Sequence, residues 1–85
     1  MKEFAYVIKD ELGIHTRPAG FLVKKLQDFS GSVTIIRGGD KCDGKKLLAL
    51  MKLRVKAGEE ITIQFEGDNE EAAAAATETY IAGIL

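Results

Sequence analysis

Alternating positions predict two strands in this 85-residue chain, one near the N-terminus and one before the final helix. Residues 4–8 place Phe4, Tyr6 and Ile8 on one face, and residues 61–65 repeat this alternation more clearly. Such a period of two is typical of a strand with one buried face. The β-branched run 33–36 predicts a further strand. Gly38-Gly39 then predicts a hairpin turn into a short strand around Lys41-Cys42.

Helical spacing appears in three other segments. From Thr16 to about Gln27, apolar residues recur at i, i+3, i+4 and i+7, namely Ala19, Leu22, Val23 and Leu26. A short helix is predicted over 47–53. Asp68, with Glu71 three residues later, is expected to cap a final helix. The expected buried side of that helix is Ala73, Ala76, Thr77, Tyr80, Ile81 and Ile84.

The predicted order is therefore β-α-β-β-α-β-α. Strands and helices with one apolar face each favour helices packed on one side of a mainly antiparallel sheet, an α+β fold. Thr34, Thr62 and Gln64 are expected on the open side. No linker or repeat divides the chain, so we expect one domain over 1–85.

Composition limits the class of protein. A hydrophobic content of 46% and a charged content of 29% are ordinary for a soluble globular protein. A single cysteine excludes an internal disulfide. The chain has no signal-peptide core and no apolar run of membrane-spanning length, so we expect a cytoplasmic protein.

Charge is distributed unevenly. Residues 15–56 hold ten basic and three acidic residues, a balance of +7, whereas residues 57–85 hold seven acidic and no basic ones, −7. This asymmetry favours steering toward an acidic partner surface over general nucleic-acid binding. A solvated charge pattern without a partner is the alternative.

The only histidine, His15, lies where a loop turns into the first helix. Gly13 permits a sharp turn, and Pro18 suits a first helical turn. Helix N-termini attract anions, and the Arg17 guanidinium matches phosphate oxygens. An imidazole beside an anion site indicates a histidine that carries a phosphoryl group, although a lone histidine is often only a surface residue.

Other chemistry is less well supported. Zinc takes three or four ligands, and Cys42 is the only thiol, so no metal site is expected. A Cys–His nucleophile pair needs a proximity that nothing in the sequence indicates. No Walker-type glycine loop is present, and we expect no cofactor.

The short helix 47–53 is too apolar for one buried face. Leu50 and Leu53 suffice for the core, which leaves Leu48, Met51 and part of Leu47 toward water; Phe21 also lies off its helix stripe. Exposed apolar groups among lysines indicate a docking patch. The lysines are Lys24, Lys46 and Lys52. Absorption into a small core is the alternative.

The segment 13–19, Gly-Ile-His-Thr-Arg-Pro-Ala, closely resembles the active-site segment of the HPr family, the histidine-containing phosphocarriers of the bacterial phosphoenolpyruvate-dependent sugar phosphotransferase system. The resemblance extends over the whole chain, including 45–53, 55–63 and 66–68. It implies an open-faced β-sandwich. It also implies that His15 accepts a phosphoryl group at Nδ1 from enzyme I and passes it to IIA domains of sugar permeases.

The same resemblance assigns further roles. Thr16 and Arg17 would bind the phosphate, and no metal or cofactor is implied. The partner-binding set would be Gly20, Phe21, Lys24, Leu47, Leu48, Met51 and Lys52. A monomer is expected. Two other functions stay open: a same-fold carrier of a regulatory relay without sugar transport, and a non-phosphorylated binding module.

Two positions depart from the family pattern. Lys46 stands where many members have a regulatory serine, and Arg54 where glycine is common. Lysine cannot cap a helix or accept a phosphate as serine does, so serine-based control at this position is in doubt. We expect Asp43 to cap the short helix instead.

Overall fold

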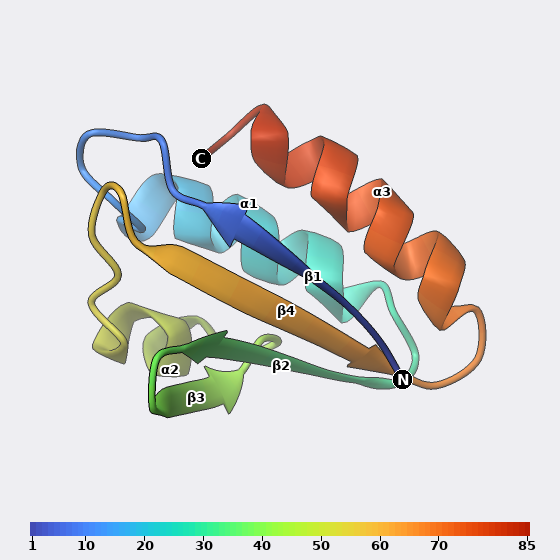
Figure 1. Cartoon of the computed structure of the whole chain (residues 1–85). Helices are drawn as coiled ribbons and strands as arrows, with labels where there is room; N and C mark the ends of the chain where they lie inside the picture. Colours follow the sequence, from blue (N-terminus) through green and yellow to red (C-terminus); the bar gives the residue numbers. More distant parts are fainter.

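The computed structural model describes all 85 residues and contains one four-stranded sheet and three helices (Figure 1). The elements are β1 (Lys2–Val7), α1 (Thr16–Gln27), β2 (Ser32–Arg37), β3 (Asp40–Asp43), α2 (Leu47–Lys52), β4 (Glu60–Glu66) and α3 (Glu70–Ala82). This order confirms the predicted β-α-β-β-α-β-α arrangement. No helix combines the length and apolar character needed to cross a membrane.

The sheet has the strand order β1-β4-β2-β3, and all neighbouring strands are antiparallel. Ile63 at its centre pairs with Phe4 on one side and with Ile35 on the other. Ile63 and Ile35 belong to the buried core, and Phe4 packs against it. The helices cover one face of the sheet (Figure 1). Thr34 pairs with Gln64 on the open face, where both are half-buried. The α+β fold with helices on one face is thus confirmed.

The core contains 18 buried hydrophobic residues drawn from the sheet and from all three helices. The predicted stripe of α1 is buried along its whole length. The Phe29 and Phe65 rings meet edge to face with centroids 5.6 Å apart, an arrangement that aromatic quadrupoles favour. Leu50 and Leu53 are buried below α2, as predicted.

The predicted face of α3 was partly wrong. Ala74, Thr77 and Ile81 are its buried residues, whereas Ala76 and Tyr80 are exposed. The run 72–76 is all alanine, so it gives no contrast by which one side could be distinguished from the other. The Tyr80 ring instead lies beneath the Lys25 ammonium, 5.7 Å from the ring centroid.

Both predicted acidic caps were also wrong. The residue before α3 is Asn69, in a left-handed conformation with φ 62°, and no side chain caps the helix. The Asp43 carboxylate accepts the Lys45 N–H at 2.9 Å, which lies before α2 begins. Asp43 therefore closes a turn in the preceding loop and does not reach the helix.

Candidate functional site

His15 is the residue that immediately precedes α1, with an extended backbone (φ −115°, ψ 174°) and a side chain 35% exposed. The loop before it turns at Gly13, whose φ of +68° favours glycine. The next residue, Ile14, is buried and donates its N–H to the Val55 carbonyl at 3.0 Å. The imidazole is thus anchored on both sides in the chain while its ring reaches solvent.

The start of α1 has free backbone donors. The N–H groups of Thr16 and Arg17 have no backbone partner, and Pro18, the third helical residue, has no N–H. No acidic side chain lies in the first turn. The positive end of the helix dipole is therefore not neutralised by the helix itself, which suits an anion beside His15.

One carboxylate contacts the ring from outside the helix. Asp10 Oδ2 lies 3.2 Å from His15 Nε2, and Asp10 Oδ1 accepts the Leu12 N–H at 2.9 Å. The Leu12 N–H and then the imidazole hold the pKa of Asp10 below its usual range. The sequence analysis missed this residue, because the contact depends on the turn that brings residues 10 and 15 together.

A hollow of about 540 Å³ lies beside the ring. Leu48 and Met51 line it, as do three cationic side chains, Lys52, Arg54 and Lys56. Arg54 and Lys56 were not among the predicted site residues. Both belong to the basic excess over 15–56, and Arg54 was noted as a departure from the family pattern, but neither signal assigned them a role in the site.

Arg17, a predicted phosphate ligand, is exposed, and its guanidinium makes no hydrogen bond. It lines a separate shallow hollow with Pro18, Phe21 and Ile84. The Arg17 side chain and the hollow beside His15 therefore lie apart around the start of α1. Thr16, the other predicted phosphate ligand, is exposed.

Arg54 has a left-handed backbone, with φ 53°. It follows Leu53, the residue that ends α2, and its N–H bonds the Met51 carbonyl at 3.2 Å. Glycine is the usual residue at this position of a helix end. Arg54 thus occupies a conformation that glycine adopts at lower cost, while its side chain adds a charge beside His15.

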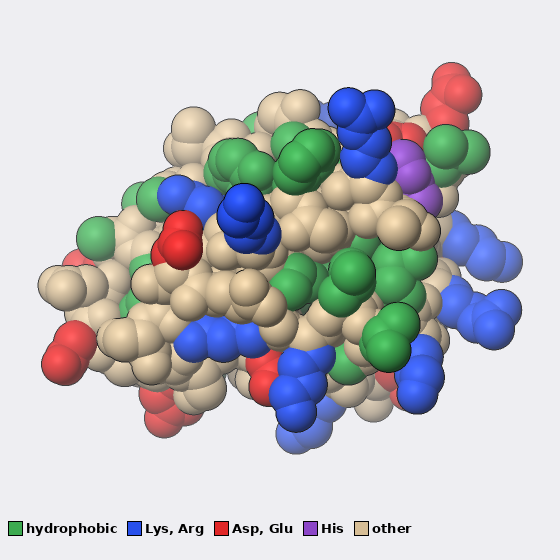
Figure 2. Space-filling view, turned by 180° about the vertical axis from the view of Figure 1, so that it is seen from behind, with side chains coloured by type: hydrophobic (Ala, Val, Ile, Leu, Met, Phe, Trp, Pro, Cys, Tyr) green, Lys and Arg blue, Asp and Glu red, His purple; other side chains and the backbone are tan.

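Figure 2 shows hydrophobic side chains grouped on the helix side of the molecule near the histidine, with lysines and arginines around them. Phe21 and Leu48 are exposed, by 45% and 75%, while Leu47 and Met51 are half-buried. The predicted exposure of Phe21 and Leu48 is thus confirmed, whereas the docking role of this surface stays a prediction. Its remaining predicted members are Gly20, half-buried, and Lys24 and Lys52, both exposed.

Lys46 is the residue that precedes α2, and its side chain makes no cap. A serine at this position could accept an N–H of the first turn, whereas lysine has only donors. The structure thus places the departure from the family pattern at the N-terminus of α2, the helix that carries Leu47, Leu48 and Met51 of the predicted docking patch.

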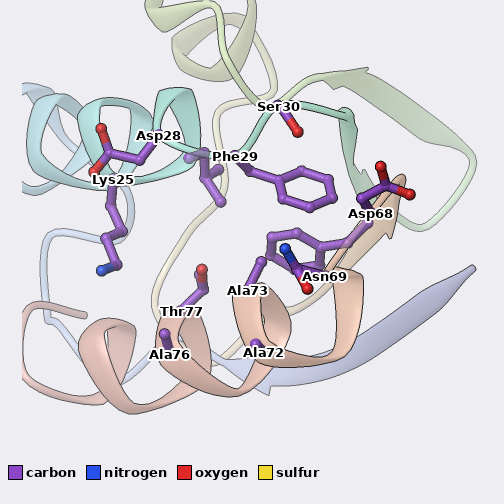
Figure 3. Close-up of a pocket in the computed structure, with 12 residues that line it drawn as sticks. Lys25, Asp28, Phe29, Ser30, Asp68, Asn69, Ala72, Ala73, Ala76 and Thr77 are labelled. Atoms are coloured by element: carbon purple, nitrogen blue, oxygen red, sulfur yellow. The ribbon is translucent and has the colours of Figure 1, made fainter.

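Other chemical candidates lie apart from His15. Cys42 is a half-buried residue of β3, and burial, followed by the Asp43 charge, raises the pKa of its thiol. No group of three or more His, Cys, Asp or Glu side chains could hold a metal ion. A cavity of about 340 Å³ with Phe29 and Phe65 in its lining opens between the C-terminal end of α1 and α3 (Figure 3). That is the end of α1 opposite to His15.

An open antiparallel sheet of this order, covered on one face by three helices and carrying a histidine at the start of the first, is the architecture of small phosphocarrier proteins. The family described as "PTS HPr component phosphorylation site" matches residues 2–83. The chain belongs to this HPr family and is a phosphocarrier of the phosphotransferase system.

Relatives and solved structures agree with this assignment. Phosphocarrier protein HPr of Mycoplasma capricolum is 38% identical over 73 residues, which cover 86% of this chain and 82% of that protein. The solved structure of a mycoplasma histidine-containing phosphocarrier protein has a TM-score of 0.92 at 33% identity, covering 96% of this chain and 93% of the other. The crystal structure of HPr from Thermoanaerobacter tengcongensis has a TM-score of 0.91 at 32% identity and covers 98% of this chain and 93% of the other.

Proposed function

We propose that His15 accepts a phosphoryl group from enzyme I, with phosphoenolpyruvate as the original donor, and passes it to IIA domains of sugar permeases. The observation that carries this proposal is the solvent-accessible imidazole beside the free N–H groups of Thr16 and Arg17. Family membership supports the general role of phosphocarrier. The proposed setting is the cytoplasm, and the proposed acting unit is one domain as a monomer.

Phosphoryl transfer requires mainly positioning and neutralisation of negative oxygens. The two N–H groups can donate to the oxygens of a phosphoryl group on His15, and the exposed Arg17 side chain can add its charge from solvent. Nδ1 is the proposed acceptor atom. Hydrolysis is limited when the carrier is alone, since the partner supplies the aligned acceptor and the remaining stabilisation.

The proposed docking surface is the apolar patch next to this site. Exposed Phe21 and Leu48 can act as anchors, with half-buried Leu47 and Met51 behind them. Lys24 and Lys52 give the patch a positive rim, and Gly20 allows close approach because a Cβ there would meet nothing within 4 Å. Acidic partner surfaces fit this rim through attraction that salt screens.

The test is incubation with phosphoenolpyruvate and purified enzyme I, followed by transfer to a panel of IIA domains. The wild-type chain should take up one acid-labile, base-stable phosphoryl group, and His15→Ala should take up none while keeping the same thermal unfolding. Arg17→Ala should be slowed but not inactive, because it removes charge and not the attacking atom.

Each possible result identifies one function. Phosphorylation of the His15→Ala variant would refute the assignment of the acceptor. Uptake from enzyme I without transfer to any IIA domain would favour a regulatory relay. No uptake by the wild-type chain would favour a binding module.

A further inference from the structure

The Asp10 side chain is held in place by bonds other than its contact with His15. Its Oδ1 accepts the Leu12 N–H at 2.9 Å, and its backbone carbonyl accepts the Gly13 N–H, also at 2.9 Å. Its own N–H donates to the Leu85 carbonyl at 2.9 Å. The second carboxylate oxygen is therefore fixed independently at 3.2 Å from His15 Nε2. It can orient the ring without being positioned by it.

We propose that Asp10 is a positioning residue, which fixes the proton of His15 on Nε2 so that Nδ1 presents a free lone pair to the incoming phosphoryl group. This inference rests on the proposed function. An ionised carboxylate can only accept hydrogen bonds, so the nitrogen facing it must be the donor. In a neutral imidazole the other nitrogen is then unprotonated.

The transfer step needs no proton movement with this arrangement. The Nδ1 lone pair forms the bond to phosphorus, and the donor's bond to phosphorus breaks, with its electron pair staying on the donor. Nε2 keeps its proton, and the ring gains a positive charge that faces the Asp10 carboxylate. In the onward step the nitrogen–phosphorus bond breaks, its electron pair returns to Nδ1, and a neutral ring is restored.

The alternative role for Asp10 is to shape the loop, and two substitutions separate that role from positioning. Asp10→Asn keeps the shape and the Oδ1 acceptor for Leu12, but its amide N–H₂ then faces Nε2 and favours the proton on Nδ1. Asp10→Ser can still accept the Leu12 N–H but is too short to reach the ring. If Asp10 only shapes the loop, Asp10→Asn should slow phosphorylation less than Asp10→Ser does. If Asp10 positions the proton, Asp10→Asn should slow it more.

The experiment measures two quantities for the wild-type chain, for both variants and for Glu11→Gln. Glu11 is an exposed neighbour of the same charge with no hydrogen bond to the ring, so it is the matched control. The first quantity is the His15 tautomer, read by ¹⁵N NMR without any phosphoryl donor. The second is the initial rate of phosphorylation from phosphoenolpyruvate and enzyme I. Amide spectra verify the fold.

We expect the Nε2–H tautomer of His15 in the wild-type chain and in Glu11→Gln. These two proteins should also be phosphorylated at equal rates. In Asp10→Asn we expect a shift toward Nδ1–H and a rate lower by about tenfold or more, as when an amide replaces the carboxylate behind a reactive histidine. The rate of phosphorylation should fall less in Asp10→Ser than in Asp10→Asn. A wild-type Nδ1–H tautomer, or an asparagine variant at least as fast as the serine variant, would overturn the inference while leaving the phosphocarrier function intact. Failure of the wild-type chain to be phosphorylated would refute the proposed function itself.

Discussion

The N-termini of α1 and α3 are built in opposite ways. Neither has a side-chain cap at the preceding residue, His15 or Asn69. The first turn of α3 contains Glu70 and Glu71, and Glu70 accepts the Gly67 N–H at 3.2 Å. The first turn of α1 contains no acid.

This difference separates a structural helix end from a binding one. Acidic side chains at a helix N-terminus balance the partial positive charge there. In α3 the chain supplies that balance itself. In α1 it does not, and the Asp10 carboxylate contacts the imidazole and not a backbone N–H of the helix. The start of α1 therefore has N–H donors without a partner in the chain, as the proposed phosphoryl site requires.

An acidic side chain in the first turn of α1 should have the largest effect on the rate of phosphorylation. Thr16→Glu should lower the rate of phosphorylation by about tenfold or more, because unit charges 4 Å apart repel by about 1 kcal/mol in water and about 4 kcal/mol near a protein surface. The same change should raise the free energy of unfolding by about 0.3–1 kcal/mol through the helix dipole. Rate assays and urea unfolding measure the two effects.

Two variants complete this comparison. Thr16→Gln, which matches the Glu variant in size but has no charge and keeps the backbone N–H, should react much faster than Thr16→Glu. Glu70→Gln in α3 should lower the melting temperature and leave the rate unchanged. An unaltered rate in Thr16→Glu would show that no anion binds at the start of α1.

The loop that leads into α1 should be intolerant of a side chain. A Cβ on Gly13 would lie 2.3 Å from the Val55 carbonyl oxygen, and its φ is +68°. Gly13→Ala should therefore cost about 1–3 kcal/mol of unfolding free energy and slow phosphorylation. Gly20→Ala is the control, since its Cβ would meet nothing within 4 Å. Equal stability of the two variants in urea would contradict this account.

Substitutions of Arg54 should change both the free energy of unfolding and the rate of docking. Arg54→Gly relieves a left-handed residue but makes the unfolded chain more flexible, so we expect a net gain of no more than about 1 kcal/mol. Arg54→Ala keeps the backbone cost and should be less stable than the glycine variant. Both should dock more slowly at low salt, because both lose the same charge beside His15. Equal stabilities would argue against backbone strain at this position.

The smallest expected effect is a dependence of stability on pH. The Leu12 N–H and the His15 ring lower the pKa of Asp10 from 3.8, so its contribution is present above that value and is lost as the pH falls through the lowered pKa. The difference in melting temperature between the wild-type chain and Asp10→Asn should shrink on acidification from about pH 6 to about pH 2. A constant difference would show that the charge of Asp10 does not contribute.

Much of the fold could be predicted from hydrophobic periodicity. The stripe of α1 and the alternation in β4 each contrast apolar with polar residues, and both were placed correctly. The exposure of Leu48 was also predicted, because the short α2 has more apolar residues than one face can bury, and that of Phe21, because it lies off the apolar stripe of α1. The alanine run of α3 lacked such contrast, so its buried face was assigned partly in error.

The site was predictable only where its residues are neighbours in the sequence. His15, Thr16 and Arg17 follow one another, so the start of α1 brings the His15 ring close to the N–H groups of the other two, although the Arg17 side chain lines a separate hollow. The Asp10 contact depends on the geometry of the Gly13 turn, and the place of Arg54 in the hollow depends on how α2 ends. The acidic caps failed for a similar reason, since Asp43 and Asp68 lie in loops whose course short patterns do not determine.

The central claim is that His15 carries the phosphoryl group on Nδ1. The most direct measurement is ³¹P NMR, with ¹⁵N spectra of the histidine ring, on the intact chain after reaction with phosphoenolpyruvate and enzyme I. The account predicts one phosphoramidate signal, coupled to Nδ1 of His15, that disappears in acid. A phosphoester signal, phosphorus on Nε2, or no signal from a folded chain with active enzyme I would contradict it.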